Sequence, residues 1–240
     1  MGEDKVGRRQ VGKMSLVHCR KDGPVAVMRM DNGENRFNPP LVSEIHRALD
    51  EFEADAAVRA VVITGTDKYF SNGLDLSALA QLQRDALSAF VLEFARMYKR
   101  VGIYPKPTVA AINGHAFAGG AMLAALADFR YMRADRGWLC LPEVDIKLPF
   151  WPGMIALLEE AFPRAQFRHA AYSGKRFTAQ ELATMGFLDG IYPNEELLPR
   201  CIEQAAFLAT KNPAAYAEIK RRIKAEMARI MDEEDPKYYF

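Results

Sequence analysis

This chain of 240 residues has few cysteines, no excess of either charge and no long apolar run. Its three cysteines, Cys19, Cys140 and Cys201, are widely spaced, so they fit neither a disulfide framework nor a zinc knuckle. No segment approaches the roughly 18 apolar residues of a membrane span, and the polar, basic start lacks the apolar centre of a secretion signal. We therefore expect a soluble protein of a reducing compartment, the cytoplasm, without a metal site.

The charges nearly cancel, because 32 lysines and arginines stand against 31 aspartates and glutamates. The resulting net charge of +1 gives no reason to expect nucleic acid or an acidic membrane surface as a partner. Half of the residues are apolar, which is enough for a sizeable core in one domain or in a domain with a small appendage.

Short apolar runs alternate with amphipathic stretches in the first part of the chain, and this alternation predicts an α/β fold. Strands are predicted over 25–30, 60–64, 109–112, 129–133 and 138–141, and helices over 39–52 and 86–102. Residues 69–76 are predicted to form a loop that leads into a polar connection.

The chain from residue 153 onward is predicted to be mainly helical. Thr178 and Glu181 have the spacing of a capping box. Residues 213–231 are expected to form one long helix, whose basic run over 220–224 is expected to face solvent. The predicted organisation is a flexible segment over 1–13, a core over 14–190 and a helical region over 191–240.

The most informative segment is 110–122, where an apolar run stops at Asn113-Gly114 and resumes at Gly119-Gly120. This pattern predicts a strand, a tight turn and a helix start, whose free amides would face an incoming anion. A second glycine turn, over 71–75, also follows a buried strand. Neighbouring strands would bring both turns to one edge of a sheet, where two amides can hold a carbonyl oxygen that gains negative charge. A glycine pair before a helix is also typical of close packing.

The chain resembles the crotonase or enoyl-CoA hydratase/isomerase superfamily over nearly its whole length after about Met14. The parts that carry the resemblance most specifically are residues 70–76, 107–128 and 141–153. The resemblance implies a spiral of ββα units followed by a helical C-terminal region, usually assembled as homotrimers or hexamers. Members of the family bind the thioester oxygen of an acyl-CoA with two backbone amides, which by motif position are those of Leu74 and Gly119. No cofactor is expected beyond the coenzyme A of the substrate. The resemblance places these further residues around the substrate: Phe37, Asn38, Asn72, Gly73, Asp75, Gly120, Met122, Phe150 and Trp151.

The acidic residues near the two amides decide which reaction the resemblance implies. Hydratases of the family use two glutamates to activate a water, and the first of those positions is Met122, whose thioether cannot take or give a proton. The second is Glu143, which we expect to be the general base. A single carboxylate suits a Δ3,Δ2-enoyl-CoA isomerase, in which Glu143 takes a proton from C2 of a 3-enoyl-CoA and returns it at C4. An apolar surround that includes Met122 should raise the pKa of Glu143.

Several alternatives stay open. The chain could be an enoyl-CoA hydratase, another crotonase-type enzyme such as a hydrolase or decarboxylase, or a non-catalytic acyl-CoA binding protein. Phe150 and Trp151 either shield the acyl site from water or pack a helix start, whereas His115 is expected to be structural. Phe37 and Asn38 match the family position near the pantetheine and adenine of CoA.

Overall fold

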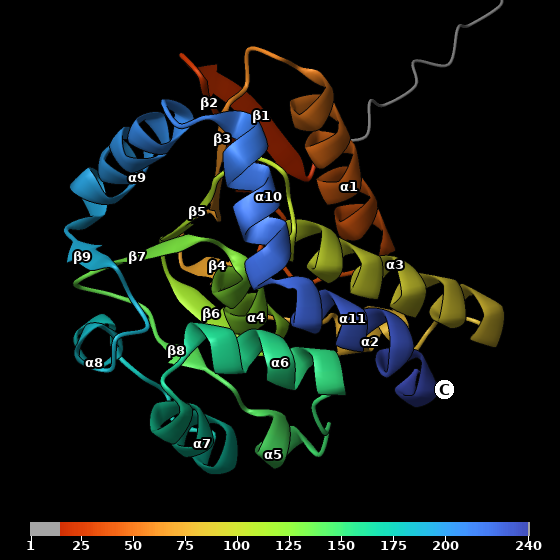
Figure 1. Ribbon diagram of the computed structural model, residues 1–240. Coiled ribbons are helices and arrows are strands. Elements are labelled where there is room, and N and C mark those ends of the chain that lie inside the picture. The colour runs from red at the N-terminus through yellow and green to blue at the C-terminus, as the bar shows by residue number, and fades with distance from the viewer. Residues whose placement is uncertain (1–14, 240) are drawn as a thin grey trace, which may run out of the picture.

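Two β-sheets organise the chain in the computed structural model, which describes residues 15–239 (Figure 1). The larger sheet has six strands in the order β1-β2-β3-β5-β7-β9. β1 and β2 pair antiparallel, and every other neighbouring pair is parallel. Its strands are β1 (Val17–Asp22), β2 (Val25–Met30), β3 (Ala60–Thr64), β5 (Thr108–Ile112), β7 (Phe129–Arg133) and β9 (Gly190–Tyr192).

The smaller sheet has three parallel strands in the order β4-β6-β8. These strands are β4 (Tyr69–Ser71), β6 (His115–Phe117) and β8 (Leu139–Cys140). Each follows a strand of the larger sheet along the chain, and each is followed by a helix. The helices are α2 (Leu76–Leu79), α4 (Gly119–Leu126) and α5 (Glu143–Ile146), with α3 (Arg84–Gly102) after α2. The ββα unit therefore repeats three times, which confirms the predicted α/β class.

The strands predicted over 25–30, 60–64 and 129–133 are confirmed with the same bounds. The expected first helix is α1 (Pro39–Ala54), and the expected second is α3. The strands β1, β4, β6 and β9 are not predicted, and the loop predicted over 69–76 is wrong where β4 forms. These strands are short or carry polar side chains, so the partner strand rather than an apolar run defines them.

The central strands β2, β3 and β5 are buried on both faces of the larger sheet, and alternate side chains of each strand point to opposite sides. Met28 and Ile63 belong to the core shared with α1, α3 and α4. Val27 and Val62 belong to a second core beneath α9 (Asn194–Ala209), which contacts β2, β3, β5 and β7. All eight residues of α4 are buried, so this helix runs through the interior of the molecule.

The rest of the chain is mainly helical, as predicted. Its helices are α6 (Pro152–Ala161), α7 (Arg164–Ser173), α8 (Ala179–Thr184), α9, α10 (Pro213–Ile223) and α11 (Ala225–Glu233), followed by the 3-10 helix η1 (Asp235–Tyr238). The capping box at Thr178 and Glu181 is present. The boundary predicted at residue 190 falls at the start of β9, and the predicted flexible segment over 1–13 lies outside the described residues.

The single helix predicted over 213–231 is wrong, because the chain bends at Lys224 between α10 and α11. α11 packs on α6 and α3, whereas α10 is held to the larger sheet through Lys220. The bend lets the two helices follow different parts of the core.

Lys220 is also a correction, since it was expected to face solvent and only 4% of it is exposed. Its ammonium group lies 2.9 Å from the Asp128 carboxylate and 3.3 Å from the Thr108 hydroxyl. The same carboxylate oxygen accepts hydrogen bonds from the Tyr216 hydroxyl and the Thr108 amide. Burial lowers the pKa of Lys220, and the Asp128 carboxylate opposes that shift. Of the predicted basic run, Arg222 is exposed and pairs with a glutamate on its own helix.

Between residues 15 and 239, no helix is both long enough and apolar enough to cross a membrane. The same residues hold no group of three histidine, cysteine or acidic side chains that could bind a metal ion. The three cysteines are free thiols.

The buried ion pair gives a stability prediction. Replacing Lys220 with methionine leaves the Asp128 charge buried without its cation, so Lys220→Met should lower the free energy of unfolding by about 3 kcal/mol. The exposed neighbour serves as the matched control, and Arg222→Met should change it by less than about 0.5 kcal/mol. Urea unfolding of both variants measures the difference. Equal effects of the two substitutions would contradict a structural role for the pair.

Candidate active site

Three loops leave the smaller sheet at one edge and surround a cavity of about 300 Å³. They follow β4, β6 and β8, whose carboxyl ends lie side by side because the three strands are parallel neighbours. Each loop contributes one of the residues expected to be catalytic, namely Leu74, Gly119 and Glu143. We call this space the amide cavity. The prediction that two glycine turns meet is confirmed, although the smaller sheet rather than the larger one brings them together.

The backbone N–H of Leu74 points away from Phe37, the residue that lies beside it in a parallel bridge. Phe37 donates its N–H to the Gly73 carbonyl at 2.7 Å and accepts from the Asp75 N–H at 3.0 Å. In this parallel bridge the N–H of the intervening residue, Leu74, points to the opposite side. Among the described residues it has no hydrogen-bond acceptor, and Leu74 lines the amide cavity.

The Gly119 amide is free for a different reason. Gly119 is the first residue of α4, and a first helical N–H has no acceptor within its own helix. Ala118 precedes it with a φ of +49°, a conformation that residues other than glycine seldom adopt, and its own N–H donates to the Cys140 carbonyl at 2.9 Å. The carbonyl of Gly119 accepts a hydrogen bond from the Tyr98 hydroxyl at 2.6 Å, which fixes the start of the helix.

Glycines allow the two loops to touch. A Cβ atom at Gly73, where φ is +77°, would lie 3.2 Å from the Gly119 nitrogen. A Cβ atom at Gly120 would overlap the carbonyl oxygen of Ser71. The free amides of Leu74 and Gly119 therefore lie close together and line the same cavity.

Glu143 begins α5 and is the only acidic residue among the described residues that line the amide cavity. Only 7% of it is exposed, and its Oε2 atom is buried without a hydrogen-bond partner. Burial raises the pKa of Glu143 to about 7, as the apolar surround was expected to do. Met122 is a neighbouring lining residue and supplies no second carboxylate. A carboxyl group with this pKa can both accept and release a proton near neutral pH.

Of the other predicted substrate residues, Asn72, Met122 and Trp151 line the amide cavity. Gly73 and Gly120 do not line it, and instead allow the close contact between the two loops. Asn38 and Asp75 do not line it either; each caps a helix, accepting hydrogen bonds from backbone amides of α1 and α2 at 3.1 Å.

Phe37, also predicted to contact the substrate, is fully buried against Phe94 and Tyr98. Its backbone orients Leu74, as described above. His115, expected to be structural, lies outside the amide cavity and packs against the Trp138 ring. The backbone N–H of Trp138 donates to the His115 Nδ1 atom at 3.3 Å. Desolvation lowers the pKa of His115.

Tyr98 is a site residue that the sequence reasoning missed. It lines the amide cavity, and burial raises the pKa of its hydroxyl well above the ordinary value, so it remains a donor to Gly119. The available signal was the aromatic spacing of Phe90, Phe94 and Tyr98, which places three rings on one face of α3.

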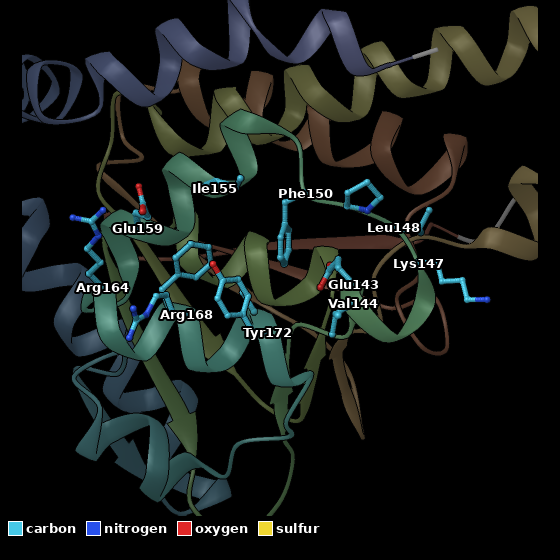
Figure 2. A pocket seen from close by; sticks show the side chains of 13 residues that line it. Glu143, Val144, Lys147, Leu148, Phe150, Ile155, Glu159, Arg164, Arg168 and Tyr172 are labelled. Carbon is cyan, nitrogen blue, oxygen red and sulfur yellow. The ribbon is translucent and has the colours of Figure 1, made fainter.

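A larger cavity of about 640 Å³ lies on the other side of Glu143 (Figure 2). Glu143, Leu148 and Pro149 line both cavities, so the two meet at the carboxylate. The predicted substrate residue Phe150 lines the larger one, where its ring lies 6.4 Å from that of Phe167.

Similarity to known proteins agrees with this geometry. The sequence model of the enoyl-CoA hydratase/isomerase family matches residues 20–235. Enoyl-CoA delta isomerase 3 of Arabidopsis thaliana is 31% identical over 211 residues, which cover 83% of this chain and 87% of that protein. A putative enoyl-CoA hydratase of Thermus thermophilus is 32% identical over 209 residues, which cover 85% and 81% of the two chains.

Solved structures show the same architecture. A probable enoyl-CoA hydratase from Mycobacterium tuberculosis has a TM-score of 0.86 to this chain at 27% identity, covering 92% of this chain and 93% of that one. The predicted crotonase-like fold is thereby confirmed.

The buried carboxylate gives a prediction about stability and pH. Between about pH 4.5 and 7 the folded protein holds a proton on Glu143 that the unfolded chain releases, so its contribution to the free energy of unfolding falls as pH rises. Glutamine does not ionise, so Glu143→Gln removes this pH dependence. The free energy of unfolding of the variant minus that of the wild type should therefore be higher at pH 8 than at pH 4, by up to about 3 kcal/mol. Urea unfolding at both pH values measures it, and a difference independent of pH would contradict the raised pKa.

The contact between the glycine loops gives a second prediction. A methyl group at Gly120 must push α4 away from the Ser71 carbonyl, so Gly120→Ala should lower the free energy of unfolding by about 1–3 kcal/mol and weaken ligand binding at the amide cavity. Gly23→Ala is the control for ligand affinity: its φ of +55° makes alanine strained and lowers stability as well, but nothing lies within 4 Å of the added methyl group, so affinity should stay unchanged. Unfolding and CoA-ester titration together test this. Unchanged ligand affinity in Gly120→Ala would show that the amides do not depend on the contact.

Proposed function

Because this chain belongs to the enoyl-CoA hydratase/isomerase family, we propose that it is an isomerase that moves the double bond of a 3-enoyl-CoA to the 2-trans position. The observation that carries the proposal is the single buried carboxylate, Glu143, in the cavity that holds the Leu74 and Gly119 amides. One carboxylate is sufficient for a proton shuttle. Activation of a water by two glutamates would need a second acid, and Met122 stands in the position expected for it.

The proposed reaction begins with the thioester oxygen at the two free amides. Glu143 takes a proton from C2, and the electron pair left behind spreads over the thioester and the double bond as a dienolate. Its negative charge is largest on the oxygen, where the amides of Leu74 and Gly119 stabilise it. Loss of one such donor typically costs about 2.7–4 kcal/mol of transition-state stabilisation.

The second step returns the proton from Glu143 to C4, which leaves the double bond conjugated with the thioester. A pKa of about 7 suits both steps, because the same group is a base in the first and an acid in the second. Tyr98 contributes by holding the Gly119 peptide in place. These residues need no metal or redox cofactor for the shuttle, and coenzyme A is part of the substrate.

The lining of the amide cavity supports isomerisation over hydration. Met122, Trp151 and Met154 present apolar surface beside Glu143, which disfavours an ordered water there. Relatives carry both hydratase and isomerase names, so hydration of a 2-enoyl-CoA is the second candidate. Assembly as a homotrimer or hexamer, implied by the family, stays a prediction.

The first experiment assays the purified protein with 3-cis- and 3-trans-enoyl-CoA and follows the conjugated thioester by ultraviolet absorbance. Glu143→Gln should lower kcat about 10³-fold, because it removes the proton carrier. In the wild type, kcat/KM should fall as pH drops below about 7, since the first step needs the ionised carboxylate. Asp145→Asn is the matched control, an acid on the same short helix that lines neither cavity.

The outcomes separate the candidates. Turnover that survives Glu143→Gln would overturn the proposed base. Addition of water to a 2-enoyl-CoA, without conversion of a 3-enoyl-CoA, would establish a hydratase. Binding of CoA esters without any turnover would indicate a binding protein.

A further inference from the structure

Two arginines line the part of the larger cavity that lies away from Glu143 (Figure 2). Arg164, Arg168 and Tyr172 are spaced four residues apart on α7, so they share one face of that helix. All three line the cavity. In Figure 2, Arg164 lies at the end of the cavity opposite Glu143, with Arg168 and Tyr172 on the same wall.

Neither arginine has a partner among the described residues. Several other exposed helical arginines do: Arg96, Arg200 and Arg229 each pair with a glutamate one turn away. Arg84, the first residue of α3, has no such pair among the described residues either. α7 contains no acidic residue with which such a pair could form. Arg164 moreover occupies the first helical position, where the helix dipole disfavours a cation. Helix stability therefore does not account for these two side chains.

The charge at this end of the cavity is positive. Glu159 on α6 is the one carboxylate among its described lining residues besides Glu143, and Figure 2 shows it next to Arg164. One carboxylate against two guanidinium groups leaves an excess of one positive charge. Lys147 lines the cavity near Glu143, but its ammonium group points away from the cavity in Figure 2.

Apolar surface separates the arginines from the carboxylate of Glu143. Phe150, Ile155 and Phe167 form this stretch of the lining. A ligand that fills the cavity from Glu143 would thus meet hydrocarbon first and positive charge afterwards. Fatty chains with a methyl end match the first part only, whereas a chain with a terminal carboxylate matches both.

We propose that the larger cavity takes the acyl chain, and that Arg168 together with Arg164 binds a carboxylate at the far end of that chain. This inference rests on the isomerase function proposed above. The substrate class is then the enoyl-CoA ester of a dicarboxylic acid. A guanidinium group suits this role because its planar donors match the two oxygens of a carboxylate. Without such a partner a carboxylate would be unfavourable beside the apolar lining.

The test measures binding, so it does not depend on turnover. Isothermal titration with saturated acyl-CoA esters compares a terminal carboxylate with a terminal methyl group at equal chain length, over a series of lengths. At the best length the wild type should bind the carboxylate ester about tenfold more tightly. The preference should disappear in Arg168→Ala combined with Arg164→Ala, and should reverse in Arg168→Glu.

Arg84→Ala is the matched control, because Arg84 is also an exposed first residue of a helix and lines neither cavity. It should keep the full preference, and all variants should bind the methyl-ended ester as the wild type does. Equal binding of the two esters by the wild type at every length overturns the inference. So does a preference that survives the double substitution or is lost in Arg84→Ala.

The outcomes also separate this inference from the isomerase proposal. A wild type that converts 3-enoyl-CoA but binds both ester types equally retains the isomerase function and refutes the dicarboxylic substrate. A wild type that prefers the carboxylate ester but converts no 3-enoyl-CoA retains the binding site and refutes the isomerase.

Discussion

The pairing of three very short parallel strands, β4, β6 and β8, fixes the positions of the chemically important groups. No strand of this sheet exceeds three residues, so its few hydrogen bonds are not a strong support by themselves. Close backbone contacts reinforce it, since a Cβ atom at Gly114 would overlap the Lys68 carbonyl and one at Gly120 would overlap the Ser71 carbonyl. The three carboxyl ends then deliver an amide, a second amide and a carboxylate to one cavity. Displacing any strand would separate groups that must act on the same few atoms of a ligand.

The burial of Glu143 in this cavity lowers the stability of the folded protein. A carboxylate in apolar surroundings destabilises the folded chain whenever it is ionised, and its Oε2 atom receives no compensating hydrogen bond. The Lys220 and Asp128 pair, in contrast, is buried with each charge offset by the other and by further hydrogen bonds. The ion pair is satisfied within the protein, whereas one oxygen of the Glu143 carboxyl group is left open to a ligand. That contrast is typical of structural and functional charges respectively.

Sequence reasoning reached the long strands, the main helices and the two glycine turns, because each carries a local signal. The apolar runs over 60–64 and 109–112 are long enough to mark buried strands. β4 and β6 could not be predicted, because three residues carry no periodicity and only pairing with a partner strand makes them strands.

The burial of Lys220 could not be predicted for a similar reason. Its neighbours are exposed arginines, and the Asp128 carboxylate that pairs with it is remote in sequence. Resemblance to a family supplied Leu74 and Glu143, which spacing alone could not single out. Aromatic spacing places Tyr98 on one face of α3, but its hydrogen bond to the Gly119 carbonyl joins residues 21 positions apart and is not predicted by that spacing.

The last helices belong to the active site although they follow it in the chain. Residues 148–151 form the partition between the two cavities, and α6 begins immediately after it. The Gly153 amide in the first turn of α6 donates to the buried Asp235 carboxylate at 2.6 Å, and Trp151 packs against Tyr239 with ring centroids 4.8 Å apart. Because Trp151 lines the amide cavity, the end of the chain holds one wall of the site in place. Removing residues 235–239 would free both the start of α6 and the Trp151 ring, so the shape of the space around Glu143 depends on residues remote from it in sequence.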